Sequence, residues 1–65
     1  MSEELRSAAK KMGMSSCPTA FMMSIDFLLK HSPKSLKNIT DGFNLTQLEV
    51  EAFNNYVNLR NGLIN

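Results

Sequence analysis

The spacing of apolar side chains along this chain is typical of helices. Apolar residues recur at intervals of three and four positions, which places them on one face of a helix with 3.6 residues per turn, and the sequence shows no alternation of the kind expected in a strand. We therefore predict an all-α fold, a compact bundle of three to four short helices in a single helical domain of residues 1–65. The helices are expected over residues 3–12, 17–31, 33–41 and 46–61.

Serine residues mark the predicted starts of the first three helices. Ser2 stands before an acidic first turn, where its hydroxyl can accept a hydrogen bond from a free backbone amide. Ser16 precedes Pro18, and Ser32 precedes Pro33. Proline is favoured in the first helical turn because the N–H that it lacks would have no partner there. Each serine is thus expected to cap the helix that follows it.

The start of the fourth predicted helix has the most complete signature. Thr46 and Glu49 have the spacing of a capping box, in which the threonine hydroxyl accepts from the Glu49 amide and the carboxylate accepts from the Thr46 amide. Leu45 and Val50 have the spacing of a hydrophobic staple, in which the two side chains pack across the first turn. This helix start is therefore the best-defined local structure in the chain.

Three isolated glycines are predicted to end helices. Gly13 follows the first helix, while Gly42 and Gly62 follow the third and the fourth. A left-handed backbone conformation often ends a helix, and glycine adopts it most readily. Phe43 is expected to fold back onto Ile39, the apolar contact that accompanies such an ending.

Apolar residues cover most of the circumference of the second predicted helix, so we expect it to be the central one. They are Cys17, Ala20, Phe21, Met22, Ile25, Phe27, Leu28 and Leu29. The first helix carries a single stripe of Leu5, Ala8, Ala9 and Met12. The fourth is expected to bury two adjacent ridges, Leu48, Ala52, Tyr56 and Leu59 beside Val50, Phe53 and Val57.

The length of the chain favours a partner. A chain of 65 residues is near the size at which one hydrophobic core barely offsets chain entropy, so a homodimer or a protein partner would supply further burial. The single Cys17 excludes an intrachain disulfide and suits a reducing compartment. The sequence has neither the pattern of a signal peptide nor an apolar stretch long enough to span a bilayer, so we expect a cytoplasmic protein that does not enter the membrane.

The formal charge of +1 is unevenly distributed. Residues 1–40 carry a net charge of +3, and residues 41–65 carry −2. This asymmetry is smaller than that of a typical nucleic-acid-binding module, which shows a clear basic surplus.

The sequence offers little for catalysis or metal binding. His31 and Cys17 are at opposite ends of one predicted helix, roughly 20 Å apart by the helical rise, too far for a nucleophile and its base. We expect Cys17 to be an inert core thiol and His31 to contact carbonyls at the helix end. Four acidic residues lie in predicted first turns, where they stabilise the helix dipole: Glu3, Glu4, Glu49 and Glu51. We therefore predict no enzyme, no cofactor and no metal site.

Two features of the sequence suggest an interaction surface. Methionine side chains repack readily around varied partners, and asparagine is a poor helix former whose accumulation on one helix face suggests a hydrogen-bonded interface. A compositional bias of the genome would explain the same asparagines. The predicted protein-interaction residues are Met14, Met23, Asn54, Asn58 and Asn61, with Lys34 and Lys37 as an electrostatic rim.

A basic corner surrounds the junction of the second and third helices, with Lys30, His31, Lys34 and Lys37. Free amides at the start of the third helix can hold an anion such as phosphate, or the corner can simply be solvated. The sequence leaves both interpretations open.

A helix-turn-helix DNA-binding regulator, acting as a dimer, is the alternative function. Asparagine and glutamine can bind adenine edges, and the third and fourth helices can form such a motif. Against it, the candidate recognition helix begins with Glu49 and Glu51 near the expected phosphates, Arg60 is its only base, and the preceding turn of residues 42–45 is long and apolar.

We therefore predict a small non-catalytic helical protein-interaction module, a regulator or inhibitor that binds a larger protein or self-associates. In its size, its wide apolar second helix and its lack of catalytic groups, the chain resembles in general character the small helical regulators with which bacteria and phages inhibit or redirect larger proteins. The resemblance rests on no shared motif.

Overall fold

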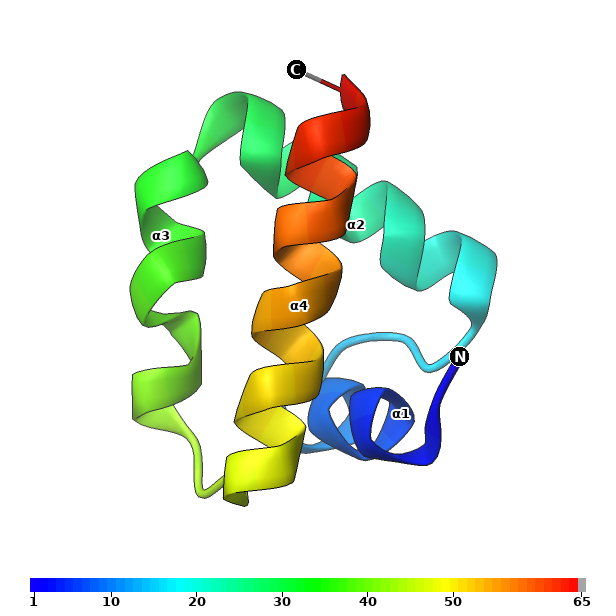
Figure 1. Ribbon diagram of the computed structural model, residues 1–65, viewed down its shortest axis with the longest axis vertical. Coiled ribbons are helices and arrows are strands. Elements are labelled where there is room, and N and C mark those ends of the chain that lie inside the picture. Colours follow the sequence, from blue (N-terminus) through cyan, green and yellow to red (C-terminus); the bar gives the residue numbers. More distant parts are fainter. Residues whose placement is uncertain (65) are drawn as a thin grey trace.

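The computed structural model describes residues 1–64, and helices make up most of them (Figure 1). The elements are α1 (Glu3–Lys11), α2 (Pro18–His31), α3 (Pro33–Asn38), the 3-10 turn η1 (Ile39–Gly42) and α4 (Gln47–Ile64). No strand occurs among the described residues. The predicted all-α bundle of short helices is confirmed.

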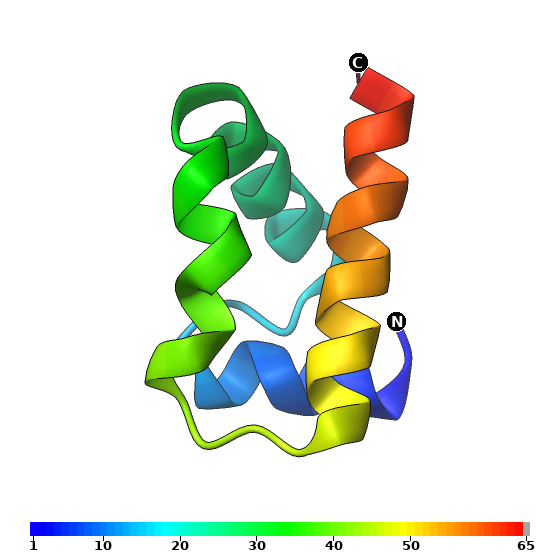
Figure 2. The ribbon, with the colours of Figure 1, turned by 60° about the vertical axis from the view of Figure 1, so that its left-hand side comes forward.

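The longest helix, α4, contacts the helices that cross behind it. Helices α3 and α4 stand beside each other, while α1 crosses near the end where α4 begins and α2 crosses near the end where it finishes (Figures 1 and 2). Only Ser32 separates α2 from α3, so the chain turns sharply there and α3 returns along the bundle. This arrangement leaves α3 and α4 as two walls on one side of the molecule.

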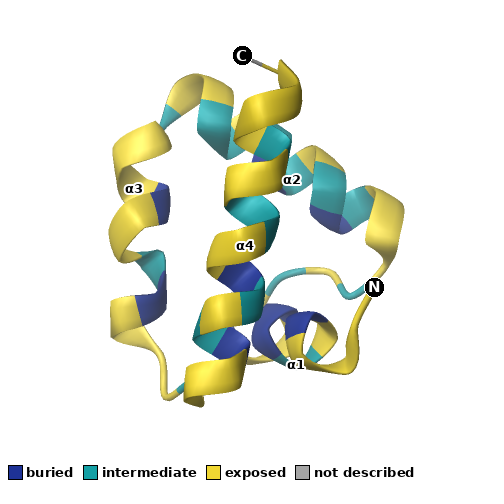
Figure 3. Cartoon of the chain, viewed as in Figure 1, coloured by how far each residue is buried: buried dark blue, intermediate teal, exposed yellow. Residues whose placement is uncertain are grey.

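The core lies where α1, α2 and α4 meet. Phe21, Ile25 and Phe53 are fully buried, and the Phe21 ring contacts Phe53 edge-on at a centroid distance of 6.2 Å and Tyr56 at 5.1 Å. The predicted apolar stripe of α1 is confirmed, because its members Leu5, Ala8, Ala9 and Met12 are all buried. Figure 3 shows these buried positions on the inner sides of the helices, with exposed positions covering the outer sides.

Two predicted helix caps are confirmed in atomic detail. The hydroxyl of Ser2 accepts a hydrogen bond from the Leu5 amide at 3.2 Å. At the start of α4 the Glu49 amide donates to Thr46 Oγ1 at 3.2 Å, and the Thr46 amide donates to Glu49 Oε1 at 2.8 Å. The capping box therefore forms as the sequence predicts.

The starts of α2 and α3 differ from the prediction. Pro18 and Pro33 do open these helices, but Cys17 occupies the capping position of α2 in place of Ser16. The amide of Cys17 donates a hydrogen bond to Ser15 Oγ at 3.1 Å. Helix α2 therefore begins one residue later than predicted. Ser32 caps α3 by position, although its hydroxyl makes no capping hydrogen bond within residues 1–64.

The predicted helix ends are right for one glycine and wrong for two. Gly13 has a φ of 73° and is the only residue of 1–64 with a left-handed backbone. Gly42 instead lies in η1, because the third helix tightens into a 3-10 turn after Asn38 and the chain leaves it in an extended conformation at Phe43. Gly62 lies inside α4, which continues to Ile64, since glycine tolerates a helical backbone at a modest cost.

Helix α2 is less central than predicted. Phe21 and Ile25 are buried, but Phe27 is 61% exposed, and Cys17 is exposed rather than being a core thiol. Helices α1, α3 and α4 cover only one side of α2, which leaves its opposite side without a covering element in the described chain.

The buried face of α4 is rotated relative to the prediction. Leu48 and Leu59, expected in the core, are 63% and 59% exposed. The inner face instead runs through Glu49, Phe53 and Arg60, which follow one another at helical spacing. Polar groups at both ends of this face find partners on other helices, and this pairing allows them to point inward.

Candidate functional site

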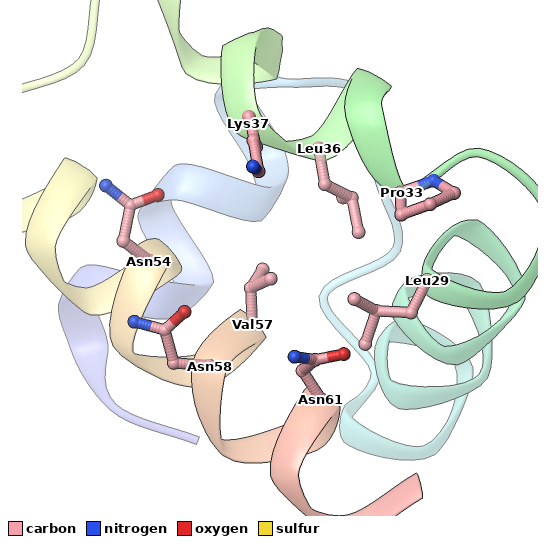
Figure 4. Close-up of a pocket in the computed structure, with 8 residues that line it drawn as sticks. All are labelled: Leu29, Pro33, Leu36, Lys37, Asn54, Val57, Asn58 and Asn61. Atoms are coloured by element: carbon pink, nitrogen blue, oxygen red, sulfur yellow. The ribbon is translucent and has the colours of Figure 1, made fainter. Parts of the chain in front are cut away.

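A groove of about 400 Å³ lies between α3 and α4 (Figure 4). Its lining residues come from three helices and combine apolar side chains with amides and one lysine. They are Leu29, Pro33, Leu36, Lys37, Asn54, Val57, Asn58 and Asn61. The groove is thus formed where the end of α2, the length of α3 and the middle of α4 converge.

The floor of the groove is apolar. Leu29, Leu36 and Val57 point toward one another from α2, α3 and α4 (Figure 4). Leu36 is buried, while the other two are partly buried and pack against the core. The floor is therefore an extension of the core that reaches the surface.

The walls of the groove are polar. On α4, Asn54, Asn58 and Asn61 follow one another at spacings of four and three residues, which places them in a row along one side of the helix. On α3, Lys37 lines the opposite wall. Pro33 stands at the start of α3 and closes the end of the groove next to α2.

Lys37 is the only charged residue among the described residues that line the groove. Lys34 lies one turn earlier on α3 and Lys30 at the end of α2, both exposed. Two nearby carboxylates, Asp41 in η1 and Glu51 in the first half of α4, belong to the end of the bundle where the chain connects α3 to α4. The one charge among the described lining residues is therefore positive, and two further lysines lie near the junction of α2 and α3.

The structure brings four of the seven predicted interaction residues into this groove: Asn54, Asn58, Asn61 and Lys37. Lys34 is exposed on α3 but does not line the groove, and Met23 is exposed on α2. Met14 is partly buried against the core, in the connection between α1 and α2. Four of the predicted interaction residues thus lie together in the groove, and the other three lie apart from it.

Sequence reasoning missed the apolar floor as part of a site. The helical spacing of Leu29 and Val57 predicts core residues, and both do pack against the core, as does the buried Leu36. The signal that distinguishes them is the shortness of α3, since a helix of six residues is too short to cover the flank of α4 along its length.

Several large apolar side chains on α2 and α4 are exposed. Those on α2 are Met23 and Phe27, and the exposed leucines of α4 are Leu48, Leu59 and Leu63. The ring of Phe27 contacts the imidazole of His31 at a centroid distance of 4.5 Å. None of these residues lines the groove.

Glu49 is at the centre of a polar network that joins α1 to the start of α4. Besides the capping bond from Thr46, it accepts hydrogen bonds from Lys11 Nζ at 2.8 Å and from the Ser7 hydroxyl. The Lys11 ammonium, the Ser7 hydroxyl and the Thr46 amide together lower the pKa of Glu49 from 4.5 to about 2. The carboxylate is therefore ionised and fully engaged, an arrangement suited to structure rather than to proton transfer.

Arg60 and Asp26 form a second polar junction, between α4 and α2. Arg60 Nε donates to Asp26 Oδ1 at 2.8 Å and Nη2 donates to Oδ2 at 2.5 Å, a bidentate pair. The hydrogen bonds from Arg60 lower the pKa of Asp26, and burial raises the pKa of Tyr56, which lies one helical turn before Arg60. Arg60, the only base of the candidate recognition helix, is thus engaged with a carboxylate of α2.

Comparison with known proteins adds no family to this description. No protein-family model, curated protein or solved structure matches the chain.

Within residues 1–64 no three His, Cys, Asp or Glu side chains are close enough together to hold a metal ion. No helix in that range has both the length and the apolar character needed to cross a bilayer. Cys17 and His31 are exposed at opposite ends of α2.

Proposed function

We propose that this protein is a non-catalytic interaction module that binds a segment of a larger protein in the α3–α4 groove and acts by occupying it, as a regulator or inhibitor. The observation that carries the proposal is the groove itself, in which an apolar floor lies between a row of asparagines and a lysine. Recognition sites commonly combine apolar contact area with a few placed polar groups, and a volume of about 400 Å³ falls in their usual range.

The composition of α4 supports the proposal. Asparagine lowers helix stability relative to residues such as Lys or Glu, so a row of exposed asparagines is costly on a helix that is merely solvated. Asn54 and Asn58 lie beside the apolar floor, where their amides can bind polar groups of a partner. Hydrogen bonds to a partner would offset the low helix propensity of these asparagines.

The shifted pKa values in this chain support a structural rather than a catalytic role for its carboxylates. Glu49 and Asp26 are each held in the ionised state by several hydrogen bonds. A general base or nucleophile needs access to substrate, and these two groups face partners within the bundle. We propose the cytoplasm as the site of action, because the exposed thiol of Cys17 suits a reducing compartment.

The experiment is affinity purification of the tagged protein from its native lysate, with and without nuclease, followed by mass spectrometry. The test variant is Asn54→Glu with Asn58→Glu, and the matched control is Asn55→Glu, which changes an exposed asparagine of α4 outside the groove. Circular dichroism verifies that all three proteins keep their helicity. A stoichiometric partner captured by the wild type and the control, but lost from the groove variant, would support the proposal.

Other outcomes would redirect the function. Material lost on nuclease treatment, bound in a strongly salt-dependent way and abolished by Lys34→Glu with Lys37→Glu, would favour the helix-turn-helix alternative. A second copy of the chain as the captured partner would indicate self-association. A partner bound equally well by the groove variant would move the site elsewhere, first to the exposed side chains of α2 and α4.

A further inference from the structure

We infer that the groove binds its partner as an extended peptide segment that carries an apolar side chain for the floor and a carboxylate for Lys37. This inference rests on the proposed function and specifies the chemistry of the partner. Three features of the groove carry it: the spacing of the asparagines, the apolar floor and the sign of the charge.

The asparagine row matches the repeat of an extended backbone. Asn54 and Asn58 are four residues apart, which separates them by about 6 Å along the helix axis. An extended chain repeats every second residue, at about 6.6 Å, and presents an N–H and a C=O to the same side at that interval. Each asparagine amide offers one carbonyl acceptor and an NH₂ donor, so two of them can bind alternate peptide units of one strand.

The same argument disfavours a helical partner in this groove. The backbone N–H and C=O groups of a helix bond to one another, so a docked helix offers its side chains and little of its backbone. The paired donors and acceptors of Asn54 and Asn58 would then lack matching groups. An extended segment supplies them without depending on its sequence.

The floor and the lysine select the side chains of that segment. Because alternate side chains of an extended strand point to opposite sides, one of them can enter the floor of Leu29, Leu36 and Val57 while its neighbours face outward. Lys37 carries the only charge among the described lining residues, and Lys34 adds to the positive charge on the same helix. Charge complementarity therefore favours an acidic residue near the apolar one.

The experiment uses a library of random linear peptides displayed on phage, selected on the immobilised full chain. The expected result is enrichment of short sequences that pair an apolar residue with Asp or Glu. The bait Lys37→Glu should reverse the preference toward basic residues, whereas the bait Asn55→Glu should enrich the same sequences as the wild type. Enrichment of basic or purely apolar sequences by the wild type, or of none that depends on the groove, would overturn the inference.

A second measurement tests the extended conformation with the best synthetic peptide from that selection. Methylation of one backbone nitrogen at a time should weaken binding at alternate positions, by about tenfold where a hydrogen bond to Asn54 or Asn58 is lost. Nuclear magnetic resonance should show shifts of the side-chain amides of these two residues on titration. Equal effects at every position, or tighter binding of a helix-stapled version, would refute the extended mode.

The two proposals fail in different ways. If the lysate partner is lost from the Asn54 and Asn58 variant but the peptide selection yields helical or basic sequences, the groove is a binding site and only its partner chemistry is wrong. If the lysate partner binds the groove variant as well as it binds the wild type, the proposed function fails, whatever the peptide selection shows.

Discussion

The two polar junctions of α4 are formed in different ways. At its start, Glu49 is almost fully buried and serves both its own helix, through the capping bonds with Thr46, and α1, through Ser7 and Lys11. At the other end, Arg60 and Asp26 form a pair that involves no local helix contact, and both side chains keep part of their surface in water. In the first junction, the Glu49 carboxylate bonds both to the start of its own helix and to α1. In the second, the bonds join only residues that are far apart in the sequence.

The two junctions depend to different extents on the rest of the molecule. The Glu49 junction begins with a capping box, which residues within one turn can form by themselves. The Arg60 junction requires α2 and α4 to cross at the right place first, because its two members are 34 residues apart. Substitutions at the two ends of α4 should therefore have different consequences.

The largest expected effect comes from removing the core residue that lies between the junctions. Phe53→Ala deletes a fully buried ring that contacts Phe21, and such a change typically costs about 3–5 kcal/mol. A domain of this size has little more stability than that, so both junctions should be lost together. Urea unfolding followed by circular dichroism measures the effect. Leu59→Ala, at an exposed position of the same helix, is the control and should change stability by less than about 0.5 kcal/mol.

Acid should affect the Glu49 junction before any other feature of the fold. The folded pKa of Glu49, about 2, is below its ordinary value of 4.5, so the unfolded chain takes up the proton first as the pH falls. The stabilising contribution is thus complete above about pH 4.5 and declines between pH 4.5 and 2. Urea midpoints measured across this range should fall with pH, and Glu49→Gln should flatten the profile.

The matched variant for the acid experiment is Asp26→Asn at the other junction. Asp26 also has a lowered pKa, through Arg60, but its side chain is more exposed to water than that of Glu49 and has fewer partners. We expect Asp26→Asn to leave more of the acid sensitivity in place than Glu49→Gln does. The opposite order would show that the Arg60 junction contributes more to stability than the Glu49 network.

A smaller effect separates the local part of the Glu49 junction from its tertiary part. Thr46→Ala removes the hydroxyl that accepts from the Glu49 amide, and loss of such a cap costs about 1 kcal/mol. Ser32→Ala is the control, since Ser32 makes no capping bond in the described chain and its loss should change stability little. Equal effects of the two substitutions in urea unfolding would contradict the role given to the capping box.

The smallest expected effect is a gain of stability at the Arg60 end. Gly62 lies inside α4, and a methyl group added there meets no atom of the described residues within 4 Å. Gly62→Ala should stabilise the protein by about 0.5 kcal/mol, because alanine loses less backbone entropy in a helix. A measurable rise in the thermal midpoint checks this, and a decrease would indicate that α4 ends at Gly62 in solution, as the sequence predicted.

Local patterns in the sequence predicted the features that depend on a few neighbouring residues. The stripe of α1, the cap at Ser2 and the capping box at Thr46 all require residues within two helical turns, and all are present in the structure. The predicted packing of Leu45 on Val50 stays a prediction, as does the role of the asparagines as a binding surface.

The features that the sequence did not predict depend on how helices cross. Leu48 and Glu49 are adjacent, so a turn of about 100° around α4 decides which of them faces the core, and apolarity alone favoured the wrong one. Glu49 points inward because Ser7 and Lys11, far away in the sequence, satisfy its charge. The groove could not be foreseen for the same reason, since it exists only where three helices converge.

The crossing of α1 with α4 has a consequence for the order in which this protein can fold during synthesis. Helix α1 is made first, yet the helix that covers it begins only at Gln47. Until α4 is translated, the apolar stripe of α1 lacks the helix that completes the core over it, so nascent α1 is exposed to chaperones or to unwanted association. Folding is completed late, when the Glu49 carboxylate in the first turn of α4 reaches Ser7 and Lys11 of α1.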